Sequence, residues 1–477
     1  MTLLGASGIR HVCQFIELSG LDRFIAPSYG SQHKISAQME KAVIEFDQKE
    51  KDRLATEMTA KEITACQDET FHPAPCLVAI DPVSNFILLE EYSIGRKSSD
   101  WTIAMQKAIN GLPINIIQST SDEGKGILHH VKNSLGAHHS PDVFHVQHEI
   151  VKGTSGPLSK KTKQAEKRLE KASEDVNRLI DKKVAYDTGQ PGPGRPPEFN
   201  KKIKTALLEE AKSLKALALA ESHQAQVKQA IRKIGDLYHP VNPETGQLLK
   251  PEEVSSALGK CFLEIQAIAT EAKLSSQCLK RIQKAKRVLP EMVSTIAFFH
   301  FSINRKLKGV SLSPAVTKIV TEKMIPSFYL SHAAEKAKTA SKRHKLKMKS
   351  EEIYPHHEMD AMFSGTTQEG LASLENLAKE CANIFQRSSS CVEGRNGQLS
   401  LRHHSFHHLS NRKLSALTTV HNFFIKRSDG TTAAERFFGN KPRDLFEFIL
   451  ANVNMPGRPA KKRRQPGAGS MLDLAAA

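Results

Sequence analysis

The sequence predicts an α/β protein in which a mixed five-stranded sheet is interrupted by a large all-helical insertion. Residues 61–150 contain short apolar runs that are separated by turn residues and by two helical segments. After residue 150 the strand pattern stops, and about 230 residues show helical spacing instead. The order of the segments, three strands followed by helix, strand, helix and strand, is typical of a mixed sheet with helical crossovers.

Residues 1–60 are predicted to form a small helical N-terminal region. Within 35–58, Met39, Val43 and Leu54 lie on one stripe between charged residues. The N-terminus lacks the basic start and long apolar run of a secretory signal, and no segment reaches the roughly 18 apolar residues of a spanning helix. We therefore expect a cytoplasmic protein without a membrane-spanning segment.

The first part of the predicted core covers residues 61–150. Its first three strands are expected at 62–71, 76–81 and 85–94, and they are antiparallel because turn residues join the last two. A helix at 98–111 should pack Trp101 and Met105 on the sheet and lead into a buried strand at 114–120. The expected remainder is a helix at 126–135 and a strand at 142–146.

Residues 151–384 are predicted to be the helical insertion. Apolar residues between Ala165 and Leu179 recur at steps of four and three, which is the spacing of a helical hairpin. The Pro/Gly-rich segment 188–198 should end that helix, and a second long helix is expected at 201–237. The basic run 338–349 is either a solvated helix face or a contact for phosphate groups.

The C-terminal part of the chain is expected to return to the core. Residues 385–455 are predicted to be compact and mainly helical, whereas 456–477 form a Pro/Gly/basic tail that should be disordered. The basic cluster of this tail, KKRR, either solubilises the chain or contacts phosphate.

The charge balance points to a polyanionic partner. Lys and Arg number 68 against 51 Asp and Glu, which gives a formal charge of +17 and a pI of about 9.4. Such an excess favours nucleic acid over a membrane surface. The seven cysteines include no C-x-x-C pair, so we expect reduced thiols and no zinc knuckle.

Three acidic residues lie where a sheet edge could gather them. Asp68 is in the first strand, where a carboxylate needs a partner or a metal unless it faces water at the strand edge. Asp122 ends the fourth strand. It either points into a cleft at the edge of the sheet or caps a helix that starts at Glu123. Asp81 is an alternative to Asp68 as the first of these acidic residues, but Asp81-Pro82 is typical of the turn between the second and third strands. Hard carboxylate ligands of this kind suit Mg²⁺.

Glu393 is the third acidic candidate. Ser390-x-x-Glu393 fits a helix capping box. Asn396 follows three positions later, so both side chains can face one side of a helix. Gly394 and Gly397 weaken that helix but allow a phosphate backbone to approach.

Taken together, these segments resemble the DDE transposases of bacterial insertion sequences. That family has an RNase H-like core with its first Asp on strand one, its second Asp after strand four and a Glu on a later helix. The matching residues here are Asp68 in ITACQDETF, Asp122 in IIQSTSDEGKG and Glu393 in SSSCVEGRNGQLS. The pair Glu393 and Asn396 is similar to the family's third motif. Asp142 and His145 are similar to a D-x-x-H element of several transposase groups.

The resemblance implies a metal-dependent DNA transposase. Asp68, Asp122 and Glu393 would hold Mg²⁺, for which Mn²⁺ can substitute, and would support strand cleavage and strand transfer. Asn396, Asp142 and His145 would lie around that site. The implied partners are double-stranded DNA, as element ends and target, and further copies of the chain in a dimer or larger synaptic complex at the nucleoid. The alternative is a non-catalytic DNA-binding remnant or a domesticated transposase fragment, because residues 1–60 show no helix-turn-helix pattern.

Overall fold

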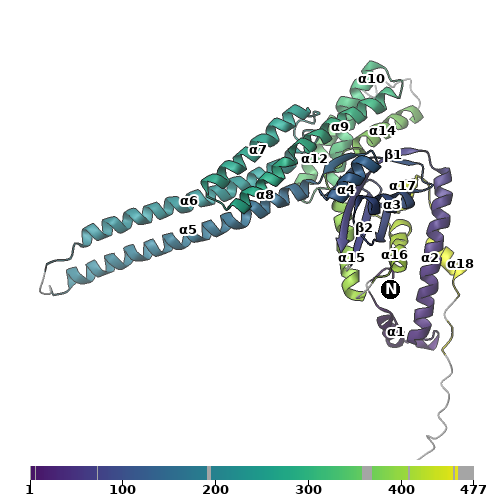
Figure 1. Cartoon of the computed structure of the whole chain (residues 1–477), viewed down its shortest axis with the longest axis horizontal. Coiled ribbons are helices and arrows are strands. Elements are labelled where there is room, and N and C mark those ends of the chain that lie inside the picture. The colour runs from purple at the N-terminus through teal and green to yellow at the C-terminus, as the bar shows by residue number, and fades with distance from the viewer. Residues whose placement is uncertain are drawn as a thin grey trace, which may run out of the picture. The chain divides into compact units, whose positions relative to one another are not determined.

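A computed structural model describes residues 2–5, 7–71, 74–190, 195–356, 368–406, 409–454 and 457–459 (Figure 1). The chain divides into two units. The first comprises Met1–Ile117, Gly124–Leu135 and Ser389–Ala477, and the second comprises Gln118–Glu123 and Gly136–Ser388. The second unit therefore starts before residue 151, where the sequence pattern begins to be purely helical.

The five strands form one mixed sheet with the order β3-β2-β1-β4-β5. Strands β1 (Lys61–Phe71), β2 (Pro75–Asp81) and β3 (Phe86–Tyr92) are antiparallel neighbours. Strands β4 (Ile114–Ser121) and β5 (His138–Pro141) pair in parallel. The predicted five-stranded mixed sheet is confirmed, and β1 is its central strand.

The turn between β2 and β3 is built by Asp81. Its buried carboxylate accepts hydrogen bonds from the backbone N–H of Ser84, at 2.9 Å, and from the Ser84 hydroxyl. Asn85 completes the turn with a positive φ of 65°, a backbone conformation that asparagine tolerates. Asp81 therefore serves the hairpin, as its position before Pro82 predicts.

Helices α15 (Ser390–Phe406) and α16 (Asn411–Phe423) pack on the antiparallel part of the sheet. Cys66 and Val78 contribute to a buried cluster with Val392 and Leu399 of α15 and Leu414 of α16. The first unit also contains α1 (Ile9–Leu18), η1 (Leu21–Arg23), α2 (Tyr29–Glu57), α3 (Ser98–Ile109), α4 (Lys125–His129), η2 (His130–Ser134), α17 (Ala433–Phe438) and α18 (Leu445–Asn452).

One predicted strand is wrong. Residues 142–146 do not form a strand, because β5 ends at Pro141 and a helix, α5 (Val143–Thr188), begins directly afterwards. The side chain of Asp142 caps that helix by accepting from the N–H of Phe144 at 2.7 Å. An aspartate at this position stabilises a helix start, and this local effect outweighs the β propensity of Val143 and Phe144.

The second unit is mainly helical. Helices α5 and α6 (Phe199–Leu237) form a long antiparallel hairpin (Figure 1), with Ala165, Ala172 and Val176 buried along the predicted seam. The described residues of 151–384 contain no strand, only an isolated bridge between Val241 and Leu248. The other helices are α7 (Pro251–Glu271), α8 (Ser276–Arg287), α9 (Leu289–Lys308), α10 (Pro314–Ile319), η3 (Val320–Met324), α11 (Ile325–Glu335), α12 (Ala340–Ile353) and α14 (Gln368–Asn383).

None of the helices in the described ranges has both the length and the apolar character that are needed to cross a lipid bilayer.

Candidate functional site

Asp68 lies on the face of the sheet that α15 covers. It is opposite Val78 of β2 and two residues after Cys66, so these side chains share one face of the sheet. Asn396 of α15 donates from Nδ2 to Oδ2 of Asp68 at 2.9 Å. Asp68 is not on an edge strand, because β1 is the central strand of the sheet, and its side chain is partly buried.

A buried ion pair fixes α15 on the sheet. Arg395 donates from Nε and Nη2 to the two carboxylate oxygens of Glu90 on β3, each at 2.6 Å, and is only 5% exposed. The hydroxyl of Thr418 on α16 adds a third bond to Glu90 at 2.6 Å. Burial has the largest single effect and acts to lower the pKa of Arg395, but the charge of Glu90 and its hydrogen bonds together outweigh burial, and the pKa is raised. Arg395 thus stays charged, and its two bonds to Glu90 set the position of the neighbouring Asn396.

Glu393 lies in the first turn of α15 and is partly buried. The N–H groups of Val392 and Glu393 both donate to the carbonyl of Ser389, so the helix starts at Ser390. The helix thus begins at Ser390 itself, one residue before the start that a capping box from Ser390 to Glu393 requires. Glu393 and Asn396 are three positions apart and face the same side of the helix. A Cβ atom at Gly394 or at Gly397 would meet no described atom within 4 Å, so both glycines border open space.

Asp122 directly follows β4, which is the neighbour of β1 in the sheet. The N–H of Lys61 at the start of β1 donates to the carbonyl of Pro113 just before β4, so the two strands begin at the same edge. The expected helix start at Glu123 is wrong, because α4 begins at Lys125 after Gly124. Asp122 is consequently not a helix cap. It belongs to the second unit, whereas Asp68 and Glu393 belong to the first.

Asp142 and His145 lie at the start of α5 in the second unit. Asp142 is 2% exposed and serves as the helix cap, and His145 follows in the first turn. The D-x-x-H element is thus a helix N-terminus and not part of a strand.

Sequence reasoning missed two further polar groups. The bidentate pair of Arg395 and Glu90 joins residues 305 positions apart. In the second unit, buried His139 of β5 lies 3.1 Å from Ser121 Oγ through Nε2 and 3.4 Å from Glu291 of α9 through Nδ1. For the ion pair, the sequence shows only that Glu90 interrupts an apolar strand. For His139, it shows only that the residue lies three positions before Asp142.

Three further segments are rich in histidine or in basic residues. His403 and His404 lie in the last turn of α15, and the histidines at positions 407 and 408 lie outside the described residues. The same holds for the KKRR segment at 461–464. The run at 338–349 lies largely on α12, where Lys345 and Lys347 are exposed.

Residues 320–465 match a family of unknown function, DUF6399. The match includes α15, and therefore Glu393, Arg395 and Asn396, but it begins after all five strands. No curated protein matches the chain.

Proposed function

We propose that the protein is a DNA transposase of the DDE type, with an RNase H-like core and Asp68, Asp122 and Glu393 as its catalytic carboxylates. The observation that supports this most is the hydrogen bond between Asn396 and Asp68, which are 328 positions apart. It brings the E-x-x-N segment of α15 onto the strand that carries the first acidic residue. The position of Asp122 directly after β4, beside β1, agrees with the same arrangement.

The donor set suits a hard divalent cation. Asp68, Asp122 and Glu393 would hold Mg²⁺, or Mn²⁺ in its place, because carboxylate oxygens are the ligands that these ions prefer. A carboxylate offers about four acceptor positions, so Asp68 can accept from Asn396 and still bind a cation. A cation held by these carboxylates would supply Lewis-acid chemistry, which favours an attacking hydroxyl and a leaving oxygen of a phosphodiester.

The remaining residues would position these ligands. Asn396 holds the Asp68 carboxylate in one orientation, and the ion pair of Arg395 with Glu90 keeps α15 in register with the sheet. Asp142 and His145 are proposed as outer residues of the second unit that support the site.

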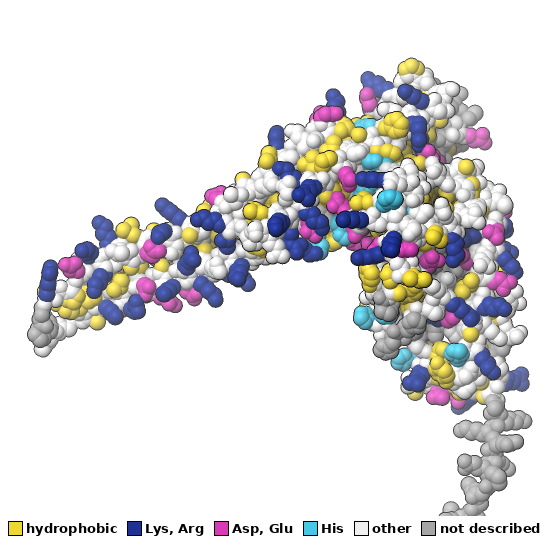
Figure 2. Space-filling model, in the orientation of Figure 1, with side chains coloured by type: hydrophobic (Ala, Val, Ile, Leu, Met, Phe, Trp, Pro, Cys, Tyr) yellow, Lys and Arg dark blue, Asp and Glu magenta, His cyan; other side chains and the backbone are white. Residues whose placement is uncertain are grey.

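The charge distribution supports DNA as the substrate. Residues 151–384 contain 40 Lys and Arg against 26 Asp and Glu, so this region holds an excess of 14 of the net +17 charges. Figure 2 shows Lys and Arg side chains along α5 and α6. Contacts of this kind with phosphates make binding sensitive to salt. We further propose that the protein acts at the nucleoid in the cytoplasm, and that pairing two element ends requires a dimer or a larger assembly.

The test is a cleavage assay with DNA that carries the element's ends and with Mg²⁺ or Mn²⁺. Asp68→Asn, Asp122→Asn and Glu393→Gln should each reduce cleavage by at least about 100-fold, because a lost hard ligand disrupts the metal site. DNA affinity should be unchanged or higher, because each variant removes a negative charge near DNA.

A matched control is Glu17→Gln on α1, which removes an exposed carboxylate outside the site and should leave cleavage unchanged. If the parent binds the ends but never cuts them, the protein is a non-catalytic DNA-binding protein. If the three carboxylate variants cut as well as the parent, these residues are not the catalytic set.

A further inference from the structure

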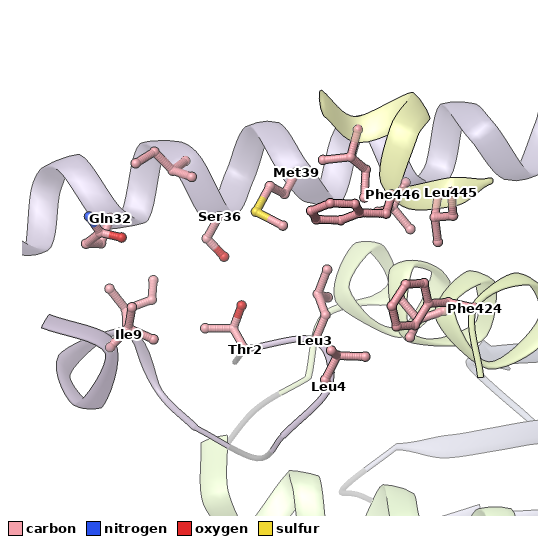
Figure 3. A pocket seen from close by; sticks show the side chains of 15 residues that line it. Thr2, Leu3, Leu4, Ile9, Gln32, Ser36, Met39, Phe424, Leu445 and Phe446 are labelled. Atoms are coloured by element: carbon pink, nitrogen blue, oxygen red, sulfur yellow. The ribbon is translucent and has the colours of Figure 1, made fainter. Parts of the chain in front are cut away.

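The first unit contains an apolar pocket that the proposed chemistry does not use. It has a volume of about 330 Å³ and lies among the N-terminal segment, α2, α16 and α18 (Figure 3). Figure 3 shows Met39 and Phe446 on the α2 side, Leu3 on the N-terminal side, and Phe424 at the end away from Gln32 and Ile9. None of the 15 lining residues is charged. A pocket of this size and lining is typical of a binding site for an apolar group.

Two of the three polar side chains that line the pocket are already engaged. Gln32 donates from Nε2 to the carbonyl of Ala26 at 2.7 Å, and the Ser36 hydroxyl lies 3.4 Å from Glu40 Oε1. With no charge and few available polar atoms, the pocket would leave a charged or strongly polar ligand unpaired. Its occupant should therefore be a set of neutral apolar side chains.

The chain itself returns to this place after α18. The N–H of Ala26 donates to the carbonyl of Gly457 at 3.1 Å, and the carbonyl of Ala26 accepts from Gln32 of the pocket lining. Helix α18 also lines the pocket through Leu445 and Phe446. The described chain therefore ends, at residue 459, next to one end of the pocket.

The sequence that follows contains a suitable apolar segment. After the basic and Pro/Gly-rich stretch come Met471, Leu472 and Leu474, the large apolar residues of the last 18 positions. Eleven residues separate them from Pro459, and such a linker spans roughly 20 Å on average. A short linker raises the local concentration of a tethered segment to the millimolar range, so weak intrinsic affinity suffices.

We propose that the C-terminal segment 471–477 binds in this pocket, with Met471, Leu472 and Leu474 filling it. The inference does not depend on the proposed function.

The experiment compares the full chain with a chain that ends at Gly469. The probe is N-phenyl-1-naphthylamine, a neutral apolar dye that fluoresces when it is bound. The truncated chain should bind the dye at least about tenfold more tightly, because the tethered competitor is gone. A synthetic peptide of residues 470–477 should displace the dye from the truncated chain, and the same peptide with Leu472→Asp and Leu474→Asp should not.

Two variants of the protein give independent controls. In the full chain, Leu472→Asp with Leu474→Asp should raise dye affinity as truncation does, without altering any described residue. Ser36→Phe should fill the pocket and abolish binding of both dye and peptide. Equal dye affinity of the full and truncated chains, or failure of the unmodified peptide to compete, would overturn the proposal.

Discussion

At the scale of single residues, His130 shows how burial sets a charge state. Its side chain is fully buried beside Trp101, and its Nδ1 lies 2.9 Å from the Thr102 hydroxyl. Burial lowers its pKa to about 4. A histidine in the unfolded chain titrates near 6.5, so below that pH the unfolded state takes up the proton first.

The lowered pKa of His130 predicts a loss of stability in acid. The free energy of unfolding is highest above about pH 6.5 and decreases as the pH falls toward 4. At pH 5 the loss from this histidine is roughly 2 kcal/mol. Urea titrations at pH 8 and pH 5 measure the change. The variant His130→Asn, which keeps a polar group, should lose about 2 kcal/mol less than the parent between these two pH values. An equal loss in both proteins would contradict the assignment.

The acidic residues differ in how far the sequence identified them. Asp68 could be singled out because a carboxylate in a buried strand needs a partner, and Glu393 because its E-x-x-N segment is similar to the third motif of DDE transposases. The hydrogen bond between Asn396 and Asp68 could not be predicted, since it joins residues 328 positions apart. The role of Asp142 as a helix cap could have been predicted, because Asp is common directly before the start of a helix.

At the scale of elements, the position of α15 depends on the ion pair of Arg395 with Glu90. Removing one partner leaves the other as an uncompensated buried charge, which typically costs about 3–5 kcal/mol. We expect Arg395→Met to lower the free energy of unfolding by about that amount. The double variant with Glu90→Gln should regain much of the loss, because no buried charge remains.

Urea titration of the two variants and the parent checks this expectation. If the double variant were as unstable as Arg395→Met alone, the cost would come from lost packing of the arginine and not from its charge partner.

The elements themselves were mostly predictable. The hairpin of β2 and β3 followed from turn residues, and the seam of α5 followed from apolar spacing, because both patterns are local. The fifth strand could not be placed correctly, because His138–Pro141 is short and its residues carry little strand pattern. Its pairing with β4 depends on contacts between segments and not on its own composition.

At the scale of the whole molecule, the positive charge predicts how the affinity for DNA, the proposed substrate, depends on salt concentration. The exposed basic face of α12 should contribute phosphate contacts, each of which steepens the salt dependence of the affinity by about 0.9 in a log–log plot. Changing the basic residues of this run to Gln should weaken DNA binding and flatten that slope, and should leave cleavage intact at saturating protein. The residues are Lys342, Arg343, Lys345, Lys347 and Lys349.

The matched control for this variant replaces Lys342, Lys345, Lys347 and Lys349 with Arg and so keeps the charge. Its salt slope should equal that of the parent. If the Gln variant also keeps the parental slope, α12 is only a solvated face and the DNA contacts lie elsewhere.

The long hairpin of α5 and α6 has a consequence for local opening. Gly153 of α5 packs near Cys278 and Arg281 of α8, and His223 of α6 pairs with Glu271 at 3.3 Å. Toward the loop, the described parts of the two helices run beside each other alone (Figure 1). Each helical turn in this part packs only against the facing turn of the other helix. Local opening should therefore begin near Tyr186 and Phe199 and proceed toward the rest of the second unit. Amide hydrogen exchange should therefore slow progressively from Tyr186 and Phe199 toward Ile150 and Ile234.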